Sequence, residues 1–329
     1  MKNTVTHILA LGATVSVLLC VYSFLPIGRY AKNPHAIHAA LIPLGEGEPV
    51  SEAQISEITI THKDDFLCLQ KQGTLWTVTT HDYMLLANTE RVEAFIHVLI
   101  KKRKMYKISY SNSGVSVDVD NFRLSIGFGE KNDTGYPVNN DKKNINMSKN
   151  VYVFTTADSL ASPVVQLDWL KGAFSIERDI SPYCTLDARF FASDAFFWGI
   201  STPIAVSGSL RTDSMAYTVS LDEATADFES RSHALLSLRH GGLLPLADEL
   251  HGTAVATLSV SDATGRMCSM QIYKSNEAAA TLVYQCVSCV TPSPADGEVE
   301  RQALSQCRFK TEISAWTFNR LCELLNVKS

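Results

Sequence analysis

The sequence has few charged residues and no surplus of positive charge. Asp, Glu, Lys and Arg make up 19% of its 329 residues, and the formal net charge is -5 at pH 7. Phosphate binding needs a clear surplus of lysine and arginine, so this composition argues against a nucleic-acid-binding protein. With 46% hydrophobic residues the chain instead has ample material for a packed core, and its length fits two domain-sized units.

Three motifs of catalytic sites are also missing. The chain has no G-x-x-x-x-G-K-[ST] loop, no G-x-S-x-G elbow and no H-E-x-x-H helix. We therefore predict no catalytic residue and no cofactor. His35 and His38 stand three residues apart but have no carboxylate pattern beside them, which argues against a metal site. Asp118 and Asp120 alternate along a predicted strand, as is ordinary for a solvated face.

The strongest signal that is present is an uncharged run at the N-terminus. Ile8–Ile27 reads ILALGATVSVLLCVYSFLPI, about 20 residues, which at 1.5 Å per residue spans a hydrocarbon core. No A-x-A cleavage pattern follows closely, so residues 1–29 are predicted to be an uncleaved signal anchor forming one transmembrane helix. Lipid attachment at Cys20 is the rival, although Leu19 is large where lipoprotein signals carry a small residue.

Either kind of anchor predicts a protein of the cytoplasmic membrane. Lys2 and the amino terminus on one side of the run nearly balance Arg29 and Lys32 on the other, so charge alone does not set the orientation. The default for a single N-terminal anchor places the bulk of the chain outside the cytoplasm. Residues 30–54 carry proline and glycine without a regular period and are predicted to be a tether.

A first α+β domain is predicted over residues 55–205, and it begins with a three-strand meander. Apolar residues alternate around the polar turns HKDD and KQG, which is typical of strands with one buried face. The alternating residues are Ile58, Ile60, Leu67, Leu69, Trp76 and Val78.

The stretch LLANTERVEAFIHVLIKKRKMYKIS, from Leu85 to Ser109, predicts an amphipathic helix. Asn88 is a suitable N-cap, and apolar residues recur at helical spacing. The apolar stripe consists of Val92, Phe95, Ile96, Leu99 and Ile100. We expect the basic cluster that follows to complete the last turn and complement the helix dipole, rather than to bind nucleic acid or lipid. That cluster is Lys101, Lys102, Arg103 and Lys104.

The remainder of this domain reads as a mixture of strands and loops. VSVDVDNFRLSIGF predicts a hairpin that turns at Asp120 and Asn121, and the Asn-rich segment Glu130–Asn150 predicts a long loop before the strand VYVF. SLASPVVQLDWL is interpreted as helical. A change in composition at Ser201–Gly208 marks the expected domain boundary.

A second α+β domain is predicted over residues 206–329. Ala254–Val260, Met267–Tyr273 and Thr281–Val290 read as strands, and a terminal helix contains Trp316, Phe318, Leu321 and Leu325. Strand, strand, strand, helix thus occurs twice, in Ile55–Ser109 and in Ala254–Leu325. The expected fold is antiparallel meanders, each packed by a helix, either as two related repeats or by chance similarity.

The C-terminal half is rich in cysteine. Cys286 and Cys289 form a C-x-x-C pair in a strand-like run, where residues three apart point to opposite faces. With three further cysteines they form a candidate disulfide or thiol cluster, and a four-thiolate zinc site is a weaker alternative. The cluster comprises Cys268, Cys286, Cys289, Cys307 and Cys322. Cys68 and Cys184 read as small buried apolar residues.

The order of segments from Ile55 to Phe154 resembles a bacterial family, domain of unknown function 4340. The resemblance rests on ISEITI, LCLQKQGTLWTV, the predicted helix with its basic end, VSVDVDNFRLSIGF and VYVF. It implies an N-terminal membrane segment, a repeated domain and association with ABC transporters of the gliding-motility type. Its motifs are structural and supply no catalytic residues.

These observations lead to three hypotheses about function. The first is a membrane-anchored, extracytoplasmic accessory or binding protein whose partners are the membrane subunits of an ABC transporter. The second is a thiol-dependent redox or hydrolytic enzyme of the cell envelope that uses thiols near Cys286. The third is a purely structural envelope protein.

Overall fold

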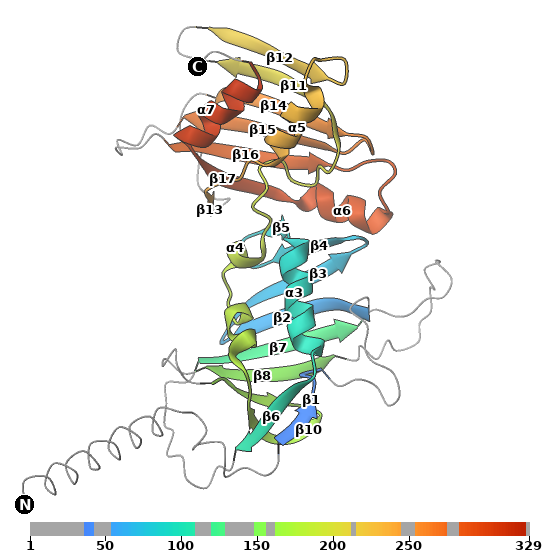
Figure 1. Cartoon of the computed structure of the whole chain (residues 1–329), viewed down its shortest axis with the longest axis vertical. Coiled ribbons are helices and arrows are strands. Elements are labelled where there is room, and N and C mark those ends of the chain that lie inside the picture. The colour runs from blue at the N-terminus through green and yellow to red at the C-terminus, as the bar shows by residue number, and fades with distance from the viewer. Residues whose placement is uncertain are drawn as a thin grey trace, which may run out of the picture.

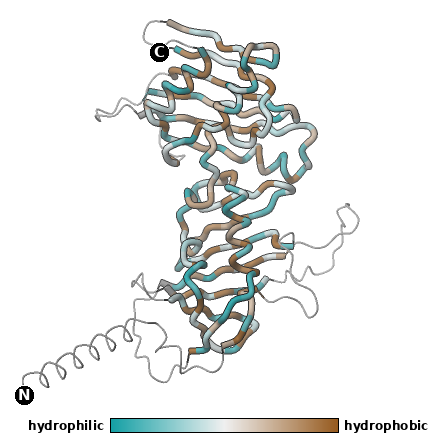
Figure 2. Tube along the Cα trace, viewed as in Figure 1, coloured by the Kyte–Doolittle hydropathy of each residue, from teal (hydrophilic) through white to brown (hydrophobic). Residues whose placement is uncertain are grey.

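The computed structural model describes residues 36–42, 54–108, 120–128, 148–155, 162–211, 215–244, 254–274 and 283–326. Within them the chain forms two antiparallel sheets, one from each half of the sequence, with a few short helices (Figure 1). Figure 2 shows hydrophobic residues along the strands of both sheets and along helix α3. The predicted mixture of antiparallel strands and packed helices is confirmed at this level.

The first sheet has the order β1-β6-β10-β9-β8-β7-β2-β3-β4-β5. Its strands are β1 (Ala36–Ala39), β2 (Ile55–His62), β3 (Asp65–Gln72), β4 (Leu75–Thr79), β5 (Met84–Leu86), β6 (Arg103–Ile108), β7 (Asp120–Phe128), β8 (Lys149–Thr155), β9 (Val164–Leu167) and β10 (Leu170–Ser175). The helices of this half are α3 (Thr89–Ile100), the 3-10 helix η2 (Arg178–Tyr183) and α4 (Ala188–Phe191).

The second sheet has the order β12-β11-β14-β15-β16-β17-β13. Its strands are β11 (Pro203–Arg211), β12 (Ala216–Asp222), β13 (Gly242–Leu244), β14 (Ala254–Asp262), β15 (Met267–Lys274), β16 (Val283–Thr291) and β17 (Arg308–Ser314). The helices of this half are α5 (Phe228–Leu236), α6 (Glu298–Gln306) and α7 (Ala315–Leu324).

The predicted meander and helix of the first half are confirmed. The six alternating apolar residues of β2, β3 and β4 are buried, and in register Ile58 lies opposite Leu69 and Leu69 opposite Val78. In α3 the side chain of Asn88 accepts a hydrogen bond from the Arg91 N–H, which caps the first turn. Val92, Phe95, Ile96 and Leu99 are buried in the first core.

The basic cluster after α3 does not form its last turn. The helix ends at Ile100, and strand β6 begins at Arg103. The Arg103 side chain is buried, pairs with Asp179 of η2 and donates to the Val98 carbonyl. Three residues of the cluster, Lys101, Lys102 and Lys104, are exposed. The helix-end prediction is therefore wrong, because none of the four basic residues lies in the last turn, and Arg103 instead ties α3 to η2.

Several local predictions are wrong. Asp120 and Asn121 lie within β7 and form no turn. VVQL is strand β9 and pairs with β10, because the β-branched valines after Pro163 favour a strand over the expected helix. The predicted tether is wrong over residues 36–42, since β1 pairs with β6 and Leu41 and Ile42 are buried. The expected boundary segment Ser201–Gly208 contains the start of β11 at Pro203, so a cut after residue 205 would fall inside this strand.

In the second half, the three predicted strands after residue 253 and the terminal helix are confirmed. They correspond to β14, β15, β16 and α7, and Phe318, Leu321 and Leu325 are buried as expected. Trp316, at the start of α7, is 71% exposed.

The two sheets share one strand order, although not in the segments that we predicted. Seven strands of the first sheet correspond, in chain order, to the seven of the second, and corresponding strands have corresponding antiparallel neighbours. The two orders are β6-β10-β9-β8-β7-β2-β3 and β13-β17-β16-β15-β14-β11-β12. In each half a helix, α3 or α5, precedes the strand at one end of this shared order, which is β6 or β13. The predicted match of Ile55–Ser109 to Ala254–Leu325 is wrong, because α6 and β17 come between β16 and the predicted terminal helix α7, whereas only β5 separates β4 from α3.

The predicted anchor Ile8–Ile27 lies outside the described residues, and so do Val115, Val117 and Val119 of the expected hairpin. Every helix within the described residues is too short or too polar to cross a membrane.

Candidate functional site

The two sheets meet at a packed joint. Four residues of the second half belong to the hydrophobic core of the first: Val290 of β16, Leu304 of α6, Cys307 at the C-terminal cap of α6, and Phe309 of β17. The ring of Trp198, in the segment that links the halves, stacks on Phe309 with 3.5 Å between centroids and 20° between planes. Both side chains are fully buried. Apolar packing thus holds the halves together.

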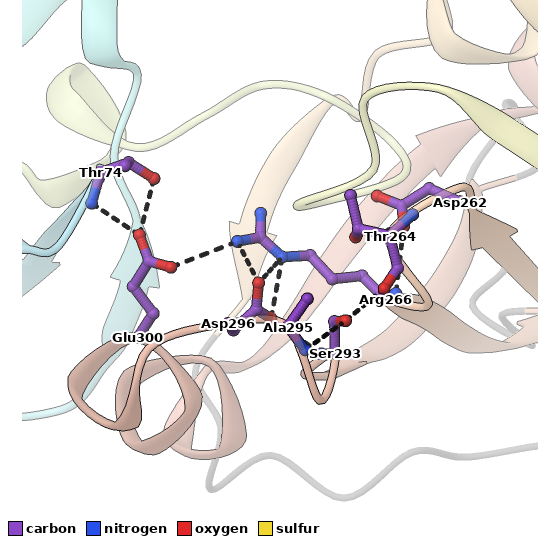
Figure 3. A network of polar contacts seen from close by, with 8 residues as sticks. All are labelled: Thr74, Asp262, Thr264, Arg266, Ser293, Ala295, Asp296 and Glu300. Atoms are coloured by element: carbon purple, nitrogen blue, oxygen red, sulfur yellow. Dashed lines mark hydrogen bonds and ion pairs between the residues drawn. The ribbon is translucent and has the colours of Figure 1, made fainter.

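A network of charged side chains crosses the same joint (Figure 3). Arg266, after the β14–β15 turn, donates to both oxygens of Asp296 over 2.6–3.0 Å, and its Nη2 lies 3.6 Å from Glu300 Oε2. Glu300 of α6 uses Oε1 to accept from the backbone N and the hydroxyl of Thr74, each at 2.6 Å. Because Thr74 lies between β3 and β4, the network links the two sheets.

Two tight turns position the arginine and its partner carboxylate. Asp262 Oδ1 accepts from the backbone N of Thr264 at 2.9 Å and of Arg266 at 3.0 Å, which closes the β14–β15 turn. In the other turn, Ser293 donates its backbone N–H to Asp296 at 2.7 Å. The Ser293 hydroxyl also donates to the Thr264 carbonyl, so the two turns are bonded to each other. Hydrogen bonds within and between the two turns therefore position Arg266 and Asp296, which are 30 residues apart, to form their ion pair.

Gly73 makes room for the glutamate. Its φ is +67°, a conformation that favours glycine, and a Cβ at this position would lie 2.6 Å from Glu300 Cγ. A side chain at residue 73 would displace Glu300 from Thr74.

Burial and pairing fix the charges of Arg266 and Asp296. Arg266, Asp296 and Glu300 have side chains only 15%, 5% and 10% exposed. The hydrogen bonds from Arg266 hold the pKa of Asp296 below its ordinary value, and Asp296 in turn raises the pKa of Arg266. The pair stays ionised at neutral pH. A permanently charged arginine is a poor proton donor, so the arrangement is suited to holding the sheets together rather than to acid–base chemistry.

An open pocket of about 430 Å³ lies beside the joint. Its walls come from the start of β3, the β4–β5 turn, α4 and Leu243 of β13, so both halves contribute. His81 packs edge-on against Phe66 with 4.6 Å between ring centroids, and Arg189 bonds both oxygens of Asp187 at 2.8–3.1 Å. Aromatic and charged groups are therefore available together, a combination that suits a polar peptide or protein surface.

Sequence reasoning missed both the network and the pocket. Thr74 and Glu300 are 226 residues apart, and the pocket combines turn residues from around 81 with others from around 187. The only local signal was turn chemistry in SDATG and SPAD. Among the described residues, no group of three or more His, Cys, Asp or Glu side chains is arranged to hold a metal ion.

The five cysteines of the candidate cluster are distributed over different environments. Cys268, Cys286 and Cys322 belong to the second core and Cys307 to the first, whereas Cys289 is exposed. β16 keeps its register through the C-x-x-C pair, which confirms that its two side chains point to opposite faces. All seven cysteines in the described residues are free thiols.

The buried thiols are poorly suited to nucleophilic chemistry. Burial raises the pKa of Cys268 and Cys307 to about 12, and that of Cys286 and Cys322 to about 11. The thiolate is the reactive form, so these groups are held in their unreactive state at neutral pH. This argues against an enzyme that uses Cys286.

Alkylation under native conditions should therefore label one described cysteine much faster than the others. We expect Cys289 to react first with iodoacetamide, and Cys268, Cys286, Cys307 and Cys322 to react only after denaturation. Peptide mass spectrometry after timed quenching gives the rate at each site. Reductant should not change the pattern. Rapid labelling of Cys286, or labelling that requires reductant, would revive the thiol-enzyme hypothesis.

Two sequence-predicted features fall in segments that the structure does not describe. Cys20, the candidate lipidation site, is one, and most of the Asn-rich segment, residues 130–147, is the other. Comparisons with protein-family models, curated proteins and solved structures found no match to this chain.

Proposed function

We propose that this chain is a membrane-attached recognition protein outside the cytoplasm, an accessory to an ABC transporter with no reaction of its own. The observation that carries the proposal is the joint. Buried charges and stacked rings hold two sheets together, and both halves line the pocket beside it. A scaffold of this kind presents loops at fixed positions, which favours recognition over chemistry.

Membrane attachment and partner rest on the sequence. The uncharged run Ile8–Ile27 is long enough to span a bilayer, and lipidation at Cys20 would serve as an anchor of the same physical kind. The resemblance of residues 55–154 to domain of unknown function 4340 supplies the partner, the membrane subunits of a gliding-type transporter. The common strand order of the two sheets supports the further proposal that the halves are diverged copies of one unit.

The proposed contact surface has two parts. One is the pocket beside the joint, where His81 and Asp82 of the β4–β5 turn are exposed. The other is the Asn-rich segment Glu130–Asn150, which the sequence marks as a long polar loop. The exposed lysines after α3 are not part of it, because they follow a helix whose apolar stripe is packed in its own core.

Crosslinking in intact cells, followed by mass spectrometry, tests this proposal. The wild type should crosslink to transporter membrane subunits. His81→Ala with Asp82→Ala, or deletion of Lys131–Met147, should reduce those crosslinks about ten-fold, equivalent to losing one good contact of 1.4 kcal/mol. The matched control changes Lys101, Lys102 and Lys104 to glutamine and leaves buried Arg103 intact.

Each outcome has a distinct meaning. Loss of crosslinks only in the lysine variant would show that the contact lies at the lysines after α3 and that the proposed surface is wrong. A wild type that is membrane-bound but crosslinks to no transporter subunit would contradict the partner and favour a purely structural envelope protein.

A further inference from the structure

Strand β12 lies at the free edge of the second sheet. Among the described strands it pairs with β11 alone, and Figure 1 shows it as the outermost strand. An edge strand presents a row of backbone N–H and C=O groups to any strand that approaches it, and proteins usually block such edges with lysine or proline. Ala216–Leu221 reads AYTVSL and contains neither. Within the part of the chain that the structure describes, this edge is therefore open to strand addition.

The first sheet shows what kind of strand fits there. By strand order β3 corresponds to β12, and the outer side of β3 is covered by the antiparallel strand β4. No described strand takes the corresponding place beside β12. β4 contains Trp-Thr-Val-Thr at 76–79, and β12 itself contains Tyr-Thr-Val-Ser at 217–220. A second β12 thus has the aromatic-Thr-Val pattern of the strand that covers β3.

We propose that a second copy of this chain occupies this edge, with the two β12 strands paired antiparallel about Val219. Tyr217, Val219 and Leu221 face or border the second core, whereas Thr218 and Ser220 are exposed. The two-fold arrangement puts Tyr217 opposite the copy's Leu221, and Thr218 opposite the copy's Ser220. Apolar residues then meet on one face and hydroxyls on the other, so the pattern is self-complementary.

Charges at the ends of the strand also match in this register. Ala216 lies opposite Arg211 of β11, and the copy's Asp222 would lie on the other side of Ala216. Arg211 and that aspartate would share one face two strand spacings apart, roughly 9–10 Å, with only a small side chain between them. The symmetry repeats the pair at the other end. A continuous sheet through both copies is the expected assembly.

Two matched variants of the full chain test both the edge and the register. Thr218→Lys with Ser220→Lys places lysine opposite lysine twice, whereas Thr218→Lys with Ser220→Glu places lysine opposite glutamate twice. Analytical ultracentrifugation in detergent measures the dimer dissociation constant, and circular dichroism checks that both variants melt like the wild type.

We expect a wild-type dimer at micromolar concentration, a dimer weakened roughly ten-fold or more in the lysine–lysine variant, and a retained dimer in the lysine–glutamate variant. A wild type that stays monomeric overturns the proposal and leaves the edge to another partner. Equal affinities of the two variants overturn it as well, because the copies would then meet elsewhere.

Discussion

Replacing Trp198 with alanine is expected to lower the free energy of unfolding by about 4 kcal/mol. The ring is fully buried and stacks on Phe309, so its removal leaves a large cavity where the two halves meet. Guanidinium denaturation of the purified chain measures the change.

Two controls distinguish packing from a general effect of the substitution. Trp198→Phe keeps an aromatic ring and removes an indole N–H that has no hydrogen-bond partner, so we expect a loss of only about 1 kcal/mol. Trp316→Ala removes an exposed ring and should change stability by less than about 0.5 kcal/mol. A Trp198→Ala loss no greater than that of Trp198→Phe would show that the stack does not stabilise the joint.

Replacing Arg266 with methionine is expected to cost about 3 kcal/mol. Methionine keeps an unbranched apolar stem but lacks the guanidinium, which leaves the buried carboxylates of Asp296 and Glu300 without their cation. Arg320→Met is the matched control, since that arginine is 45% exposed and pairs with Glu323 three residues along α7. It should cost less than about 0.5 kcal/mol.

The acid dependence of stability provides a second measure of the same network. The folded-state pKa of Asp296 lies below its unfolded value, so its contribution is present above the unfolded pKa near 3.8 and is lost as pH falls through the folded pKa. In Arg266→Met the pKa should return toward or above the ordinary value, and this part of the acid loss should disappear. An Arg266→Met variant as stable as Arg320→Met would contradict a structural role for the network.

The features that the sequence predicted well depend on neighbours along the chain. Alternation in β2, β3 and β4, the spacing of the α3 stripe and the Asn88 cap are all local patterns, and all are confirmed. The failures depend on distant partners. Arg103 was predicted to be a helix-end cation but is buried and pairs with Asp179, 76 residues away. Ala36–Ala39 reads as a tether because its pairing partner, β6, follows much later.

The candidate site was beyond sequence reasoning for the same reason. Nothing near Glu300 indicates that its carboxylate bonds Thr74 in the other half, and nothing near Phe309 indicates a stack on Trp198. The C-x-x-C pair shows the same limit, because the spacing of two cysteines does not give their environments, and β16 places Cys286 in the core and leaves Cys289 exposed. Local turn chemistry in SDATG and SPAD was the readable part, because it positions Arg266 and Asp296.

Calorimetry of the wild-type chain measures most directly whether the two sheets behave as one body. With the joint intact, we expect a single transition whose calorimetric and van't Hoff enthalpies agree. In Trp198→Ala that transition should separate into two, one for each sheet. Two transitions in the wild type, unchanged by the substitution, would show that the joint does not couple the sheets and would contradict a rigid recognition scaffold.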